Sequence, residues 1–451
     1  MDCAMKEVEI LSRALLYIDE NSQKFEASPE AKMLWIKLLI LTRCDNWQTT
    51  LASRELCACL RISSSTFTKS VKQLEKVRLL CRDSFETGKG GNSYRYHVTL
   101  PRNRNAKGMH VSAPFLKLSS TFIHYEGLLN NAKKPSLANK LIFLVLLHFS
   151  DDFGHVSELG RAKIADITGM NKERVKSHVE RLCSLGFINK VPGGTIPQLM
   201  GKVSTQYYLN IWHSAFQQQV HGYRFTQQNL IMTASLSEMV ISSVIRQKPM
   251  HNQTEHSLNA FYESSLIASV KVSIDACQVR YFFTGENRKL LANHIELKVN
   301  DIASYLLNQH WNMIDGTSLI SGKAPDELLS DDGLADSIAE RFLPESVMHH
   351  HKKNTDFQRN YNEDSLANEA LDTEAHDIDF VPGAKELVNL VIHMAWAKAI
   401  EAKNVITINR KLFDDLPEQG VYKVLPYSAR GNGIDIIQSL DALAISRMHS
   451  R

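Results

Sequence analysis

Cysteine is scarce and scattered in this chain. The 451 residues include 7 cysteines, an odd number, and Cys57-Ala58-Cys59 has no second pair beside it. A disulfide framework is therefore excluded as the basis of the fold, and a zinc site is not expected. This usage favours a reducing cytoplasm, in which Cys57 and Cys183 serve as small apolar core groups.

Long apolar runs are missing as well. No stretch approaches the roughly 18 apolar residues of a membrane helix, and Met1 opens a polar, amphipathic segment rather than a basic and then apolar leader. We therefore expect a cytoplasmic, nucleoid-associated protein that contacts no membrane.

Catalytic signatures are lacking too. No nucleophile stands beside a base in a known motif, and the glycines of residues 430–433 lack the lysine and the spacing of a phosphate-binding Walker loop. The histidines at 349–351 lie in a polar tract, where such a run is usually solvated. We expect no enzyme, no catalytic residue, no cofactor and no metal.

Charge is unevenly distributed along the chain. The net charge is only +3, yet residues 30–213 carry 27 Lys and Arg against 13 Asp and Glu, whereas residues 214–451 carry 22 against 30. A basic first half joined to an acidic remainder predicts a polyanion-binding module followed by a partner or assembly region.

One pattern of helices occurs twice, 108 residues apart and without a gap. A short apolar helix around residues 56–62 is followed by a capping residue, Ser63, and by Phe67, Val71 and Leu74 at helical spacing. The second copy has Asn171 as the cap and then Val175, Val179 and Leu182. Each copy predicts a helix-turn-helix.

The flanking segments extend both copies. A leading helix is predicted at 31–42 and at 138–149, and glycine-rich turns at 88–92 and 192–194 join β-prone runs into hairpins. The order helix, helix, turn, helix, hairpin resembles the winged-helix family in two tandem copies over about residues 30–213. The fold class implied is mainly α with small β-hairpin wings (α+β), similar to bacterial transcription regulators or two-winged-helix plasmid replication initiators.

The resemblance assigns double-stranded DNA to the outward face of each second helix and to the wings. Small hydroxyl groups beside Lys and Arg at a helix N-terminus suit both phosphate and base-edge contact. The candidate DNA-binding residues are Ser64, Ser65, Thr68, Lys69, Lys72 and Lys76, with Lys89 and Arg95 in the first wing, then Lys172, Arg174, Lys176, Ser177 and Arg181, with Lys190 and Lys202 in the second wing. Glu173 and Glu180 make the second copy the less basic of the two.

The predicted organisation is an N-terminal helix (1–29), a first winged helix (30–101), a basic connector (102–134), a second winged helix (135–213), a helical domain (214–323), an acidic flexible linker (324–380) and an α/β segment (381–451). Within these parts we predict an extended start at 113–116, helices at 226–246, 256–272, 287–311, 383–403 and 434–448, and strands at 279–284, 405–408 and 421–425. The apolar tip of the second wing, around residues 196–200, predicts either packing on a neighbour or insertion against DNA.

Three functions fit this organisation. The first is a transcription regulator, which reads an asymmetric site as a single chain or a longer repeated site as a homodimer formed through the C-terminal half. The second is a replication initiator of a plasmid or mobile element, which binds tandem repeats beside an AT-rich stretch. The third is a non-enzymatic scaffold subunit of a chromosome-organising complex, against which the basic first half argues.

Overall fold

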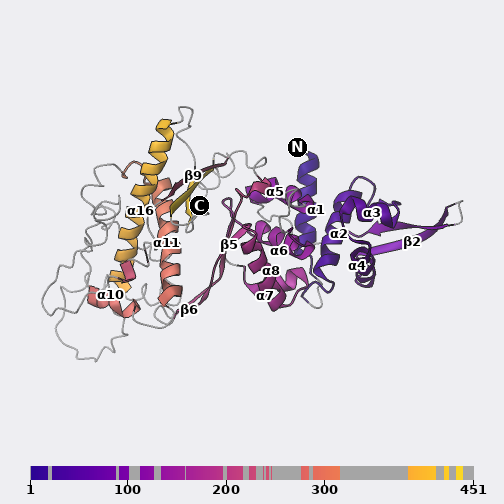
Figure 1. Ribbon diagram of the computed structural model, residues 1–451, viewed down its shortest axis with the longest axis horizontal. Helices are drawn as coiled ribbons and strands as arrows, with labels where there is room; N and C mark the ends of the chain where they lie inside the picture. Colours follow the sequence, from indigo (N-terminus) through magenta and orange to yellow (C-terminus); the bar gives the residue numbers. More distant parts are fainter. Residues whose placement is uncertain are drawn as a thin grey trace, which may run out of the picture. The chain divides into compact units, whose positions relative to one another are not determined.

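The chain divides into two compact units in a computed structural model. The structure describes residues 2–18, 23–87, 91–100, 112–125, 134–157, 159–196, 201–216, 223–229, 237, 240–242, 245, 276–283, 288–314, 384–412, 421–425 and 433–439. Unit 1 comprises Met1–Val191 and Ser204–His221, and unit 2 comprises Pro192–Val203 and Gly222–Arg451 (Figure 1). The described residues are mainly helical with small antiparallel sheets, which confirms the α+β class.

The first half of unit 1, which we call repeat 1, begins with two helices. Helix α1 (Asp2–Leu16) and α2 (Pro29–Thr42) precede strand β1 (Gln48–Thr49) and the pair α3 (Ser53–Leu60) and α4 (Ser64–Lys76). Strands β2 (Leu80–Thr87) and β3 (Gly91–Val98) then form a hairpin in a sheet of order β1-β3-β2. The predicted N-terminal helix, the helix predicted at 31–42 and the first hairpin are confirmed.

Repeat 2 follows the same order. It has α5 (Ala113–His124), α6 (Leu137–His148), β4 (His155–Val156), α7 (Arg161–Thr168) and α8 (Lys172–Ser184). Strands β5 (Ile188–Val191) and β8 (Gln206–Leu209) complete a sheet of order β4-β8-β5, and the short helix η3 (Ser214–Phe216) ends the repeat.

The 108-residue offset holds to the residue in the structure. It relates α3 to α7 and α4 to α8 at both ends, and it also relates α1 to α5, a correspondence absent from the sequence interpretation. Positive φ angles recur at the same three turns of each repeat, namely at Asn46, Arg61 and Arg78 in repeat 1 and at Gly154, Gly169 and Gly186 in repeat 2. The two repeats therefore share one backbone path.

Helices α2 and α6 form the centre of their repeats. Almost every residue of either helix is buried, and Trp35 of α2 and Phe143 of α6 occupy equivalent fully buried positions. Both helices begin with a serine, Ser28 or Ser136, whose hydroxyl accepts a hydrogen bond from the backbone N–H three residues later. The helices α2 and α6 also pack on each other, so the two repeats share a single core.

Unit 2 is built around two long helices, α11 (Arg288–Gln309) and α16 (Ala384–Leu412). Strands β9 (Tyr223–Asn229), β10 (Val421–Leu425) and β11 (Gly433–Ser439) form an antiparallel sheet of order β10-β11-β9. Helix α10 (Ala276–Phe283) and a second hairpin, β6 (Gly194–Ile196) with β7 (Gly201–Val203), complete the described part. The hairpin packs on α11, where Leu290 lies against Gly194.

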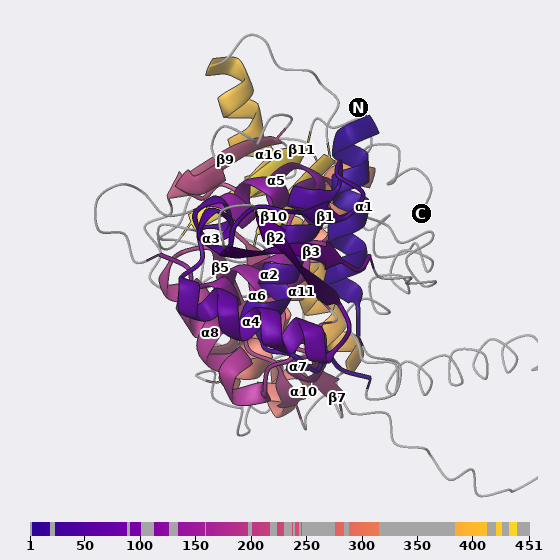
Figure 2. The ribbon, with the colours of Figure 1, turned by 90° about the vertical axis from the view of Figure 1, so that its right-hand side faces the viewer.

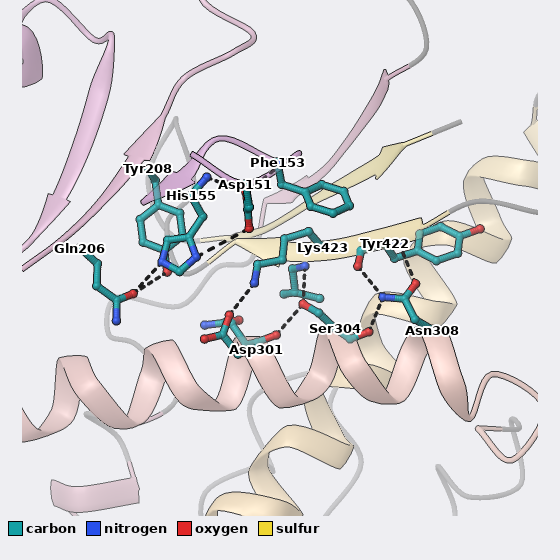
Figure 3. A network of polar contacts seen from close by, with 12 residues as sticks. Asp151, Phe153, His155, Gln206, Tyr208, Asp301, Ser304, Asn308, Tyr422 and Lys423 are labelled. Carbon is teal, nitrogen blue, oxygen red and sulfur yellow. Dashed lines mark hydrogen bonds and ion pairs between the residues drawn. The ribbon is translucent and has the colours of Figure 1, made fainter. Parts of the chain in front are cut away.

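Polar side chains anchor small strands in both units, as Figure 3 shows. In unit 1, Asp151 accepts hydrogen bonds from the backbone N–H groups of Phe153 (2.9 Å) and His155 (2.8 Å), which shapes the turn into β4. In unit 2, the Asn308 side chain bonds both the N–H and the C=O of Tyr422 at 2.8 Å. The two hydrogen bonds of Asn308 connect α11 to β10.

Several predicted elements in the C-terminal half were wrong. Residues 279–283 lie in α10 because Val279, Phe282 and Phe283 bury one helical face in the unit 2 core. The β-branched run at 405–408 continues α16, where the Thr407 hydroxyl bonds the carbonyl oxygen of Lys403, four residues earlier. The predicted helix at 287–311 and the strand at 421–425 are confirmed.

Strands replace two other predicted helix starts. Residues 223–229 and 433–439 pair with each other as β9 and β11, since a strand partner more than two hundred residues away outweighs local propensity. Conversely, the predicted extended start at 113–116 belongs to α5, which Ser112 caps and a proline opens.

Some predictions concern residues that the structure does not describe. These are the helix at 256–272, the acidic tract 324–380 with its histidine run, and the connector at 102–111. No helix among the described ones has the length and apolar character to span a bilayer.

Candidate nucleic-acid interface

Helix α4 separates a buried face from an exposed face. Phe67, Val71 and Leu74 are at most 3 % exposed and pack beneath the helix, where Phe67 meets Tyr96 of β3 edge-on. Six of the sequence-predicted residues lie on the opposite, solvent-exposed side, namely Ser64, Ser65, Thr68, Lys69, Lys72 and Lys76. The amphipathic spacing of the sequence therefore places all six on one surface.

The N-terminus of α4 presents hydroxyl groups. The Ser63 hydroxyl accepts a hydrogen bond from the Thr66 N–H at 3.2 Å and lies 3.2 Å from the Ser65 hydroxyl. The first turn of a helix carries partial positive charge and unsatisfied N–H groups, which suit a phosphate. A cluster of this kind beside lysines suits an anionic polymer.

The only acidic side chain of α4 is directed into an ion pair. Glu75 lies 2.8 Å from the guanidinium of Arg82 on β2, and both groups are about one-third exposed or less. The Arg82 guanidinium in turn lies over the exposed ring of Tyr94. With Glu75 paired in this way, Lys69, Lys72 and Lys76 leave the exposed face of α4 uniformly cationic.

Helix α8 has the same two-sided construction but a mixed surface. Val175, Val179 and Leu182 are buried, while the predicted residues Lys172, Arg174, Lys176 and Ser177 are exposed and Arg181 is half-buried. Glu173 and Glu180 are exposed on the same helix. Burial, and secondarily the nearby Arg174, lowers the pKa of His178 and so favours its neutral form.

One candidate of α8 already has a partner. The Arg174 guanidinium lies 3.3 Å from the carboxylate of Glu30, at the start of α2. Two residues earlier, the backbone N–H of Ser28 donates to the Gln73 side chain of α4 at 3.1 Å. Residues 28–30 therefore contact both second helices, and α4 and α8 lie on the same side of unit 1, opposite α1 and α5, in both views (Figures 1 and 2).

The hairpins differ between the repeats. Arg95 is exposed on β3 and lies over the Phe85 ring, whereas the side chains of Lys89 and Lys202 are outside the described residues. Lys190 is half-buried on β5. The second hairpin, β6–β7, belongs to unit 2 and packs on α11 through Gly194. The side chains of its apolar tip, residues 196–200, lie outside the described part of the chain.

Sequence reasoning missed the contribution of Ser28, Glu30 and Gln73. The Ser28-Pro29-Glu30 string reads as an ordinary helix start, and nothing local indicates that Glu30 meets Arg174, 144 residues away. Only tertiary packing brings these groups together.

No protein-family model matches the chain, and a comparison with curated proteins found no significant match. Among the described residues, no group of three or more His, Cys, Asp or Glu side chains is placed to hold a metal ion.

Proposed function

We propose that this chain binds double-stranded DNA through two tandem winged helices, with α4 as the principal recognition helix and α8 as the second. The observation that carries the proposal is the exposed face of α4, which combines hydroxyl groups at the helix N-terminus with three lysines and directs its only carboxylate away into the Arg82 pair. An exposed helix preceded by a tight turn and followed by a hairpin is the arrangement that enters a major groove.

The role that we propose is sequence-specific transcription regulation. In this proposal, lysines along α4 supply phosphate contacts, while Ser65 of α4 and Arg174 of α8 are the residues that we propose to contact base edges. Replication initiation is the second candidate. It is favoured by the contacts of residues 28–30 with both α4 and α8, because an initiator reads repeated sites with two helices held together.

The test begins with selection of bound sequences from random duplex DNA by the full-length protein. For the selected site, Lys69→Ala with Lys72→Ala should lower affinity on the order of tenfold or more, and should reduce the slope of log affinity against log salt by about 1.8 if both lysines contact phosphates. Lys134→Ala with Lys289→Ala removes the same charge at exposed positions outside α4 and α8 and serves as the control. Equal affinity of the first double variant and the wild type at matched salt contradicts the interface.

Mapping of bound sites across the host genome separates the roles. Occupancy at many promoters supports regulation, and a single cluster of repeats beside the gene itself supports initiation. Chromosome association without discrete sites contradicts both roles and leaves the scaffold function.

A further inference from the structure

A lysine is buried at the junction between the two repeats. Lys32 of α2 is 0 % exposed, and its ammonium group donates to the carbonyl oxygens of Leu15 (2.8 Å) and Tyr17 (2.9 Å) at the end of α1. Its third hydrogen bond, of 2.5 Å, reaches the carbonyl oxygen of Ile167 at the end of α7. An ammonium group has three donors and no acceptor, so all three are satisfied.

The acceptors are suited to a cation. Carbonyl groups in the last turn of a helix have no partner within the helix and carry partial negative charge. Here the ends of α1, from repeat 1, and of α7, from repeat 2, converge on one nitrogen. Complete burial lowers the pKa of Lys32 well below its usual value.

Other contacts close the same junction. The backbone N–H of Phe25 donates to the Asp166 carbonyl oxygen of α7 at 2.8 Å. Beyond the end of α7, a Cβ on Gly169 would come within 2.2 Å of the carbonyl oxygen of Ala27. The chain at 25–27 is therefore pressed against the turn between α7 and α8, close to where residues 28–30 contact α4 and α8.

We propose that Lys32 is a positioning residue that holds α4 and α8 at one separation, so that the chain reads two DNA segments at a fixed spacing. This inference rests on the proposed DNA binding. A buried ammonium group with three directional bonds defines one geometry, whereas an apolar side chain at this place would fill the space without fixing the end of α7 relative to α1.

Repeat 2 provides a matched control. Lys140 stands 108 residues after Lys32, is 3 % exposed, and donates at 3.2 Å to the carbonyl oxygen of Ile123, which is the counterpart of Leu15. That bond lies within repeat 2. Lys140→Met therefore removes a buried lysine of the same kind while leaving the bond between the repeats in place.

The experiment measures affinity for a series of duplexes that carry the selected composite site with zero, one or two base pairs inserted between its two halves. Two base pairs displace one half by about 7 Å and rotate it by about 70°. The wild type and Lys140→Met should lose about tenfold or more at this insertion, while Lys32→Met should lose about threefold or less, with weaker binding to the parent site.

A second pair of variants covers failure of Lys32→Met to fold. Gly169→Ala presses on Ala27 across the junction, whereas Gly186→Ala meets only the edge of the His213 ring, at 3.8 Å, although both glycines have positive φ. The positioning role is supported if Gly169→Ala, but not Gly186→Ala, loses little affinity when base pairs are inserted between the two halves of the site. An unchanged spacer profile in Gly169→Ala or in folded Lys32→Met overturns it, and absence of any DNA binding by the wild type overturns the proposed function instead.

Discussion

Repeat 1 and repeat 2 have the same backbone but different surfaces. Helix α4 exposes lysines and hydroxyl groups, and its Glu75 forms an ion pair with Arg82. Helix α8 instead exposes Glu173 and Glu180, and its Arg174 forms an ion pair with Glu30. The interiors differ as well, since Phe67 and Ile40 of repeat 1 correspond to Val175 and His148 of repeat 2. The shared backbone shows that the fold tolerates these exchanges, so each difference can be tested by substitution at one position.

The largest difference in stability between the repeats is expected from the buried side chains beneath α4 and α8. Phe67 packs against Tyr96 and is 3 % exposed, while its counterpart Val175 is fully buried. Phe67→Ala should destabilise repeat 1 by about 3–5 kcal/mol, and Val175→Ala should cost repeat 2 about 2 kcal/mol, because the smaller side chain leaves the smaller cavity. Amide hydrogen exchange, measured separately in each repeat, checks both values. Equal losses of stability in the two variants would mean that the contact between Phe67 and the Tyr96 ring of the hairpin stabilises repeat 1 little.

Acid should weaken repeat 2 through His148. Its ring is 3 % exposed and lies edge-on to Phe115, and burial lowers its pKa from 6.5 to about 4. Because folding lowers the pKa of His148, the stability contributed by its neutral ring is fully present above about pH 6.5. This stability is lost as the pH falls toward 4, and the loss amounts to about 2 kcal/mol at pH 5.

His148→Ile introduces the residue found at the equivalent position 40. This variant should retain its stability between pH 7 and pH 5 better than the wild type by about 2 kcal/mol, as followed by denaturant unfolding at both pH values. An identical pH dependence in the two proteins would exclude His148 as the acid-sensitive group.

The helix caps should behave alike in the two repeats. Ser63 and Asn171 each accept a hydrogen bond from the N–H three residues later, at 3.2 Å and 2.8 Å. Alanine at either position should cost about 1 kcal/mol, because one N–H of the first turn loses its acceptor. Hydrogen exchange in the first turn of α4 and of α8 measures the loss, and a threefold larger effect in one repeat would break the equivalence.

The smallest effect is expected at the Glu30–Arg174 pair. Both groups are at least one-third exposed, so Glu30→Gln should change stability by no more than about 1 kcal/mol. Under the proposed function the freed arginine should raise DNA affinity about two- to fivefold at low salt. Glu180→Gln, which removes a carboxylate from the far end of α8, is the control, and a fall in affinity on freeing Arg174 would speak against a DNA contact there.

Local sequence patterns were sufficient for much of unit 1. Period-3.6 apolar positions, capping residues and glycine turns located α2, α4, α6 and α8, because each of these signals acts within a few residues of the chain. The same patterns assigned the exposed face of α4 correctly, since burial of Phe67, Val71 and Leu74 leaves only one side for its lysines.

The sequence by itself determined the repeat, its period and the polarity of its second helices. Only the tertiary structure decided that β9 pairs with β11, that residues 405–408 extend α16, and that Lys32 and Glu30 join the two repeats. These outcomes depend on partners distant in the chain. Their energies come from strand pairing, core burial and convergence of helix ends, which no local window of sequence contains.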